Sequence, residues 1–352
     1  MPSKGVVLFA DVPAVNGHRR GASEVLALEP VANRPIAHHV LDALLAAEVD
    51  QLVLAGPADV LIDVRACLRG YSPQPSQVDY AVTAENSGLI GALRAVHPFV
   101  GAAPCVVHLA DGLLGEPLAP YLALTRDALA DLLLLRPGAV GELQRDGLPE
   151  ESSPSRPNTD PSVDADAGIG VFGPGALAQA CQAKFRGEAP GSKRLAEHFA
   201  NQGRYVEIRC AERWRRYRGD PTDLLELNRL ALDGLVTLVP RTIGQENRIE
   251  GPVNIDPTAS VTGSVIVGPV VVGAGAEIAS AYIGPYTSIG SQARIEGAEI
   301  ERSIISPGAT VRHVGGRLAG SLVGPNARIF RDFSLPRAIR VRVSAGDEVG
   351  LC

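Results

Sequence analysis

The most constraining feature of this sequence is an apolar repeat of about six residues that begins near Val239. Aliphatic residues recur at intervals of five or six, at Ile266, Val272, Ile278, Ile283, Ile289 and Ile295. Glycine often follows directly, and the pair Gly-Pro appears at 268–269, 284–285 and 324–325. Such a repeat is typical of a parallel β-helix, in which each short strand points an aliphatic side chain inward and glycine permits the corners. Three strands make one coil, so we expect about four or five coils.

The sequence before this repeat alternates short apolar runs with helical patterns. We expect strands at 6–9, 51–55, 80–83 and 105–109, and helices at 36–47, 89–96 and 125–130. This alternation predicts an α/β fold with a mixed sheet and helices on both faces. Ligands of such sheets bind beyond the carboxyl ends of the strands. We therefore expect two domains, 1–238 and 239–352.

Composition narrows the class of protein. The chain has 352 residues, which is enough for two hydrophobic cores. Its 33 Lys and Arg residues against 39 Asp and Glu give a formal net charge of −6, which argues against nucleic acid as a partner. The 5 cysteines show no CxxC spacing, and no apolar stretch approaches the roughly 20 residues that span a bilayer. We expect a cytoplasmic protein with reduced thiols and no membrane segment.

Several segments resemble one known family. They are a strand at 4–9, the run Pro30-Val31-Ala32-Asn33 before a helix, and the segments 106–114, 167–172 and 214–229. They resemble the sugar-1-phosphate nucleotidyltransferases, especially the glucose-1-phosphate thymidylyltransferase-like branch. The resemblance implies a Rossmann-like nucleotidyltransferase domain followed by a left-handed β-helix of hexapeptide repeats. It also implies that an NTP and a sugar-1-phosphate form an NDP-sugar and pyrophosphate, with Mg²⁺ as the cofactor.

The first departure from the family pattern is the loop at 10–21. In the family this loop is rich in glycine and carries an Arg, and a Lys stands shortly before the Pro-Val-Ala-Asn run. Here the loop has no paired glycines, Pro13 removes one backbone amide, and the Lys is absent. Arg19 and Arg20 are candidates to supply positive charge from a shifted position. The alternative is that both are solvated loop residues.

The second departure concerns the two acidic residues that hold Mg²⁺ in the family. Asp111, after the expected strand 105–109, matches the first of them, although an Asp there also suits a simple turn. Tyr217 stands where the second Asp belongs, and a neutral tyrosine does not replace a carboxylate as a Mg²⁺ ligand. Asp220 is a substitute only if the turn around it is rebuilt.

The substrate-side motifs are only partly retained. Glu85 and Gly88 match the turn that contacts base and sugar in the family, and Gly168 lies in the segment 167–172 that matches the sugar-side strand, so the resemblance makes these three residues candidates for nucleotide or sugar binding. The Glu-Lys-Pro motif is missing, and a Pro- and Ser-rich segment, 146–167, which we expect to be a loop, stands in its place. The resemblance is therefore close in scaffold motifs and poor in catalytic ones.

These patterns predict a catalytically impaired sugar-1-phosphate nucleotidyltransferase homologue that acts as a binding, regulatory or structural partner. The alternative is an active glucose-1-phosphate nucleotidyltransferase with rewired ligands, Asp111, Asp220, Arg19 and Arg20. A third possibility, an acyltransferase using His313 of the repeat, has little support. The expected partners are a sugar phosphate or nucleotide, and either a second copy of the chain or an intact paralogue, joined through the β-helix. The segment 338–343 is a candidate edge strand.

Overall fold

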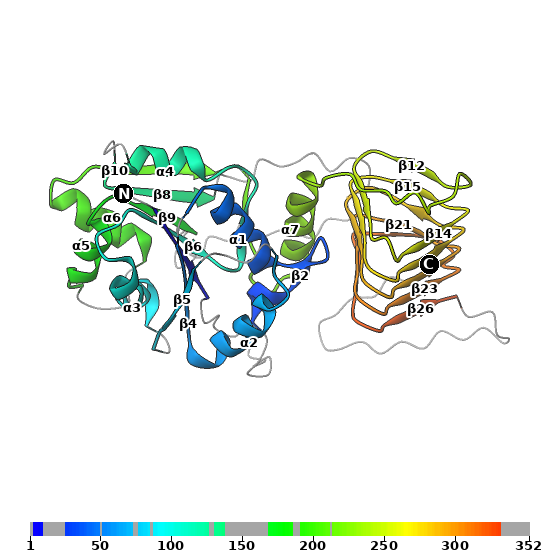
Figure 1. The fold of residues 1–352 in the computed structure, drawn as a ribbon, viewed down its shortest axis with the longest axis horizontal. Coiled ribbons are helices and arrows are strands. Elements are labelled where there is room, and N and C mark those ends of the chain that lie inside the picture. The colour runs from blue at the N-terminus through cyan, green and yellow to red at the C-terminus, as the bar shows by residue number, and fades with distance from the viewer. Residues whose placement is uncertain are drawn as a thin grey trace, which may run out of the picture.

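A seven-stranded mixed sheet forms the centre of the N-terminal part (Figure 1). The computed structural model describes residues 3–9, 25–49, 51–72, 77–84, 87–126, 130–137, 168–185, 191–211 and 213–331. In spatial order the strands are β10 (Val206–Ala211), β8 (Leu132–Pro137), β9 (Ile169–Phe172), β6 (Cys105–Leu109), β1 (Lys4–Leu8), β4 (Gln51–Gly56) and β5 (Val78–Val82). Strand β9 is antiparallel to β6 and β8, and the other neighbours are parallel.

Both faces of this sheet are buried. Val6 and Leu8 pack into one hydrophobic core and Val7 into the other, because successive side chains of a strand point to opposite faces. One core contains side chains of α3 (Gly88–Val100), α5 (Ala176–Gln182) and α6 (Ser192–Asn201). The other contains side chains of α1 (Ile36–Ala46), α2 (Ala58–Leu68), α4 (Ala119–Arg126) and α7 (Pro221–Asp233). Burial on both faces explains why the strands appear in the sequence as continuous apolar runs.

The predicted α/β class is confirmed, with differences in detail. The strand predicted at 105–109 has those bounds, and the predicted first helix ends one residue earlier than expected. The helix predicted at 125–130 was wrong, because α4 occupies Ala119–Arg126 and Ala130 is not helical. Pro120 lies in the first turn of α4, where a missing backbone N–H does not break the helix. The predictions for 146–167 and 338–343 lie outside the described residues.

The repeat folds into three five-stranded parallel sheets, which together make five coils and confirm the predicted β-helix. The first sheet holds β12 (Arg248–Glu250), β15 (Val265–Val267), β18 (Tyr282–Ile283), β21 (Glu299–Glu301) and β24 (Arg317–Ala319). The second holds β13 (Val253–Ile255), β16 (Val270–Val272), β19 (Thr287–Ile289), β22 (Ile304–Ile305) and β25 (Leu322–Val323). The third holds β14 (Ser260–Thr262), β17 (Glu277–Ala279), β20 (Arg294–Glu296), β23 (Thr310–Arg312) and β26 (Arg328–Phe330).

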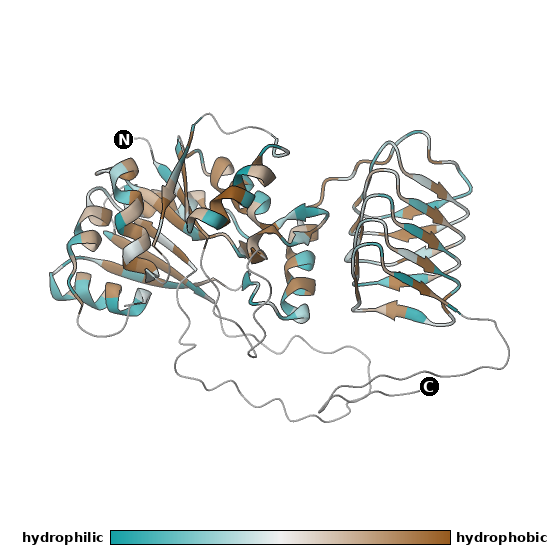
Figure 2. Cartoon of the chain, turned by 90° about the horizontal axis from the view of Figure 1, so that it is seen from below, coloured by the Kyte–Doolittle hydropathy of each residue, from teal (hydrophilic) through white to brown (hydrophobic). Residues whose placement is uncertain are grey.

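Aliphatic residues stack in register along the inside of the coils. Ile266, Ile283 and Ile300 are paired in successive strands and all are completely buried. The coil strands in Figure 2 accordingly carry brown apolar positions beside teal polar ones. Two corners are glycines with φ of +53° and +56°, Gly263 and Gly297, in the left-handed region that glycine occupies without strain.

The two parts of the chain meet through α7, which lies between the sheet and the coils in Figure 1. Asn228 of α7 is completely buried, and its Oδ1 accepts hydrogen bonds from the backbone N–H of Ala32 (2.8 Å) and the hydroxyl of Ser288 (2.6 Å). Its Nδ2 donates to the Tyr286 carbonyl at 3.2 Å. Asn33, in the turn between β2 (Pro30–Val31) and β3 (Arg34–Pro35), donates to the Ile289 carbonyl at 2.7 Å. These bonds join the entry of α1 to strand β19.

Candidate functional site

The candidate site is built on a two-stranded antiparallel hairpin beside the carboxyl end of β6. Strand β7 (Gly112–Leu114) follows β6 after a short turn and pairs with β11 (Trp214–Arg216). In this register Arg216 lies opposite Gly112, and the backbone N–H of Tyr217 donates to the Asp111 carbonyl at 2.8 Å. Segments about one hundred residues apart in sequence are thereby held side by side, with Asp111 next to Arg216.

A bidentate ion pair dominates the chemistry of this site. Arg216 Nε donates to Asp111 Oδ1 at 2.9 Å, and Arg216 Nη2 donates to Oδ2 at 3.0 Å. The Asp111 side chain is 7% exposed and the Arg216 side chain 25% exposed. Two parallel N–H···O bonds of this kind are the strong form of an arginine–carboxylate contact. Both oxygens of Asp111 are therefore engaged by a cation that belongs to the chain itself.

The indole of Trp214 fixes the hairpin against the sheet. A β-carbon at either Gly112 or Gly168 would overlap the Trp214 ring, so both positions require glycine for lack of space. Trp214 also meets the ring of His108 edge-on, with centroids 5.2 Å apart. Gly168, predicted to take part in nucleotide or sugar binding, is here the neighbour of a packed tryptophan.

His108 is the buried titratable group closest in sequence to Asp111. Burial lowers the pKa of His108 to about 4, although its Nδ1 lies 2.6 Å from the Leu109 carbonyl oxygen, a contact that favours the protonated ring. The imidazole is therefore neutral at pH 7. His108 and His39 line a cavity of about 150 Å³ together with residues of β7 and α7.

The donor set does not fit a Mg²⁺ ion. Mg²⁺ requires oxygen ligands in nearly octahedral geometry, and Asp111, the expected first ligand, is already bound by Arg216. Tyr217 is 4% exposed and packs in the core of the sheet. Asp220 is exposed and caps α7, where its carboxylate accepts the Thr222 backbone N–H at 2.7 Å. Among the described residues, no group of three or more His, Cys, Asp or Glu side chains is arranged to hold a metal ion.

The remaining predicted site residues are distributed as follows. Arg19, Arg20 and Glu85 lie outside the described residues. Gly88 is the first residue of α3 and has a φ of +61°. The proposed roles of these residues stay predictions. Arg216, which lies between the matched Trp214 and the mismatched Tyr217, was not among the predicted site residues. Four arginines stand in the segment 213–218, and the sequence pattern does not show which one reaches Asp111.

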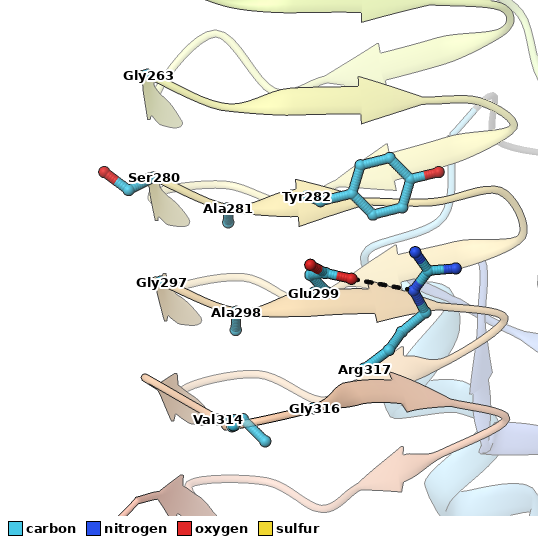
Figure 3. A pocket seen from close by; sticks show the side chains of 11 residues that line it. Gly263, Ser280, Ala281, Tyr282, Gly297, Ala298, Glu299, Val314, Gly316 and Arg317 are labelled. Atoms are coloured by element: carbon cyan, nitrogen blue, oxygen red, sulfur yellow. Dashed lines mark hydrogen bonds and ion pairs between the residues drawn. The ribbon is translucent and has the colours of Figure 1, made fainter.

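A second concave surface lies on the β-helix (Figure 3). This groove of about 500 Å³ follows one corner of the coils, and Tyr282, Glu299 and Arg317 form one side of it. Arg317 donates to Glu299 and to Glu301, each at 3.2 Å, and its guanidinium lies 5.3 Å from the Tyr282 ring centre. The charged side chains of the groove thus contact one another across successive coils. His313, the candidate of the acyltransferase alternative, lies 3.5 Å from Glu296 on a neighbouring coil.

The architecture is a mixed α/β sheet with helices on both faces, followed by a left-handed parallel β-helix. The chain resembles glucose-1-phosphate thymidylyltransferases. Those of Streptomyces antibioticus and Streptomyces griseus are each 28% identical to it, over 325 and 327 residues, or 89% of this chain and 90% of each relative. A low-salt glycan biosynthesis nucleotidyltransferase of Haloferax volcanii is 26% identical over 338 residues, or 92% of this chain and 93% of that protein.

A solved structure from Bacillus anthracis, described as a glucose-1-phosphate thymidylyltransferase in complex with sucrose, has a TM-score of 0.49 and 17% identity, covering 68% of this chain and 98% of that chain. No family model matches the chain. The predicted resemblance to sugar-1-phosphate nucleotidyltransferases is confirmed along nearly the whole chain by the curated relatives. Within the described ranges, every helix is too short or too polar to traverse a bilayer.

Proposed function

We propose that this chain is a catalytically impaired homologue of the sugar-1-phosphate nucleotidyltransferases and acts as a binding, regulatory or structural partner. The observation that carries the proposal is the bidentate pair between Arg216 and Asp111. Asp111, at the position of the family's first metal ligand, is paired with the guanidinium of Arg216, and Tyr217 occupies the position of the second metal ligand.

The chemistry of nucleotidyl transfer explains why these changes matter. The oxygen of a sugar-1-phosphate attacks the α-phosphate of an NTP, and pyrophosphate leaves with its negative charge. The protein contributes mainly by positioning the groups and stabilising charge, with metal ions, Arg and Lys as the usual means. Loss of one such donor costs about 3–4 kcal/mol of transition-state stabilisation. A site without a metal pair and without the glycine-rich loop therefore retains little turnover.

Pyrophosphate release tests the proposal directly. The full chain is incubated with glucose-1-phosphate, each of the common NTPs and Mg²⁺, and we expect no release above the protein-free blank. The matched control is Asp111→Asn, which should be indistinguishable from the unaltered chain. Turnover that disappears in Asp111→Asn would show an active enzyme with rewired ligands and would end the proposal.

We further propose the setting in which the chain works. A division near residue 238 into a nucleotidyltransferase-like domain and a β-helix domain is supported by the change from sheet to coils after α7. A cytoplasmic location and assembly through the β-helix, with a second copy or with an intact paralogue, are consistent with the architecture. Light scattering of the purified chain, alone and after co-expression with a paralogue from its host, tests the assembly. A strictly monomeric chain that binds neither would exclude it.

A further inference from the structure

Both oxygens of the Asp111 carboxylate accept a hydrogen bond from the Arg216 guanidinium, an arrangement that disfavours a divalent cation at the same place. A Mg²⁺ ion needs a carboxylate oxygen about 2.0–2.1 Å away and several further oxygen ligands. In this site the guanidinium of Arg216 lies against both oxygens, at 2.9 and 3.0 Å. A metal ion at Asp111 would therefore have to displace Arg216 and sit beside its positive charge.

The hairpin makes that displacement difficult. Arg216 ends strand β11, whose pairing with β7 fixes its backbone opposite Gly112. The next residue, Tyr217, donates its backbone N–H to the Asp111 carbonyl and has a buried side chain. On the other side, Trp214 fills the space left by Gly112 and Gly168. The guanidinium is thus held over Asp111 by its neighbours on both sides.

The guanidinium of Arg216 suits an anionic ligand rather than a metal ion. A guanidinium has five N–H donors, and Asp111 accepts two of them. A quarter of the Arg216 side chain is exposed, whereas the Asp111 side chain is 7% exposed. The Arg216 side chain is therefore more accessible to an incoming molecule than the Asp111 side chain. Phosphate oxygens suit this geometry, because a guanidinium binds phosphate and carboxylate in the same forked manner.

We propose that Arg216 takes the place of the divalent cation at this site. Asp111 then binds no Mg²⁺, and the site takes a phosphorylated ligand, such as a sugar phosphate or nucleoside diphosphate sugar, without a metal ion. This inference rests on the proposed function for the identity of the site, and it states how that site holds charge.

Manganese binding tests the first half of the inference. Mn²⁺, which replaces Mg²⁺ and is visible by electron paramagnetic resonance, is titrated into the full chain. We expect no bound Mn²⁺ in the unaltered chain, in Arg216→Lys, which keeps the positive charge, or in Arg213→Gln. Arg213→Gln is the matched control, because Arg213 lies in the same segment as Arg216 but pairs with Asp233, an exposed residue at the end of α7. Arg216→Gln should bind Mn²⁺ only weakly, because Asp111 is then a lone carboxylate and no group of three or more His, Cys, Asp or Glu side chains is arranged around a metal position among the described residues.

The outcomes separate clearly. Binding of Mn²⁺ to the unaltered chain that is lost in Asp111→Asn would overturn the inference. Should Arg216→Gln fail to fold, Arg216→Lys provides a second test. Mn²⁺ that binds to Arg216→Lys and is lost when Asp111→Asn is added would contradict the inference, because the lysine keeps the positive charge beside the carboxylate.

Ligand binding tests the second half. Glucose-1-phosphate, dTDP-glucose and UDP-glucose are titrated calorimetrically in EDTA and again in Mg²⁺. At least one probe should bind with the same affinity in both, and Arg216→Gln should weaken it about tenfold, as expected for a lost charge-assisted hydrogen bond. Binding that requires Mg²⁺, or no binding of any probe, overturns this half.

The inference and the proposed function fail in different ways. Pyrophosphate release by a chain that binds no Mn²⁺ at Asp111 refutes the proposed function and leaves Arg216 as the substitute cation. Conversely, Mn²⁺ bound at Asp111 without any turnover refutes the inference and leaves the loss of catalysis in place.

Discussion

The hairpin beside Asp111 and the coil that contains Thr287 differ in whether a buried polar side chain has a hydrogen-bond partner. Asp111 is 5% exposed, and both of its oxygens accept hydrogen bonds from Arg216. Thr287 is completely buried in the β-helix, and its hydroxyl lacks a hydrogen-bond partner among the described residues. The polar groups of the candidate site thus form a pair, whereas Thr287 is the one buried side-chain oxygen or nitrogen without a hydrogen-bond partner among the described residues. The two regions should therefore respond to substitution with opposite signs.

Breaking the matched pair should produce the largest effect. Arg216→Gln leaves the Asp111 charge buried without its partner, so we expect the free energy of unfolding to fall by about 3–4 kcal/mol. Asp111→Asn should cost less, because the Arg216 side chain is 25% exposed and can reach water. Urea denaturation of the two variants measures the difference. An equal or larger loss in Asp111→Asn would mean that the pair is not the buried, matched unit described above.

Acid should destabilise the folded chain through His108, a second buried polar group of the same region. Burial lowers the pKa of His108 from 6.5 to about 4, so the unfolded chain binds a proton that the folded chain does not. Stability is complete above pH 6.5 and falls as the pH decreases toward 4, by about 3 kcal/mol for this residue, since one pKa unit corresponds to about 1.4 kcal/mol. Unfolding measured from pH 7 to pH 4 should show this loss.

The control for the acid effect is His108→Gln. Burial also lowers the pKa of His38 and of His39, and both contributions remain in the variant. The difference in slope between the two proteins therefore isolates His108. Parallel slopes would indicate that the buried imidazole accepts a proton without penalty, through its contact with the Leu109 carbonyl.

Asn228 extends the comparison to the junction between the two regions. Asn228→Ala removes the acceptor for the Ala32 backbone N–H and the Ser288 hydroxyl in a completely buried position. We expect a loss of about 2 kcal/mol, because buried donors are left without partners. Ser288→Ala removes only one of the donors and should cost less. If both substitutions are neutral in urea denaturation, the junction is not held by this amide.

The fold could be predicted because its determinants are periodic. Completely buried Ile266, Ile283 and Ile300 are one coil apart in sequence and also lie in paired strands, so the repeat and the structure carry the same information. Strand β6 was predicted with its observed bounds, because an apolar run buried on both faces needs no partner to be recognised. Helix α4 begins before the predicted segment 125–130, because a proline that reads as a helix breaker in the sequence is compatible with the first helical turn, where Pro120 lies.

The site could be predicted only in part, because its key contact joins distant segments. Asp111 was identified from the motif around it, and the mismatch at Tyr217 was visible in the sequence. The partner of Asp111 depends on the register of β7 against β11, and a shift of one residue would bring Arg215 or Tyr217 to the same place. No local pattern fixes that register. Gly168 shows the same limit, since its contact with Trp214 appears only when the strands are paired.

Filling the unmatched position with an apolar group should give the smallest effect, and with the opposite sign. Thr287 and Ile289 lie on the same face of β19, and Ile289 belongs to the core of the β-helix, so Thr287 also points inward, beside Val270 of the preceding coil. Thr287→Val replaces a buried hydroxyl, which has no hydrogen-bond partner in the part of the chain that the structure describes, with a methyl group of nearly the same size. We expect the free energy of unfolding to rise by about 1 kcal/mol, because the desolvation penalty of the hydroxyl is removed.

Thr310→Val, at a half-buried position of β23, is the matched control and should change stability by less than about 0.5 kcal/mol. A destabilised Thr287→Val protein, measured by urea denaturation beside that control, would show that the hydroxyl is satisfied and would remove the contrast with Asp111.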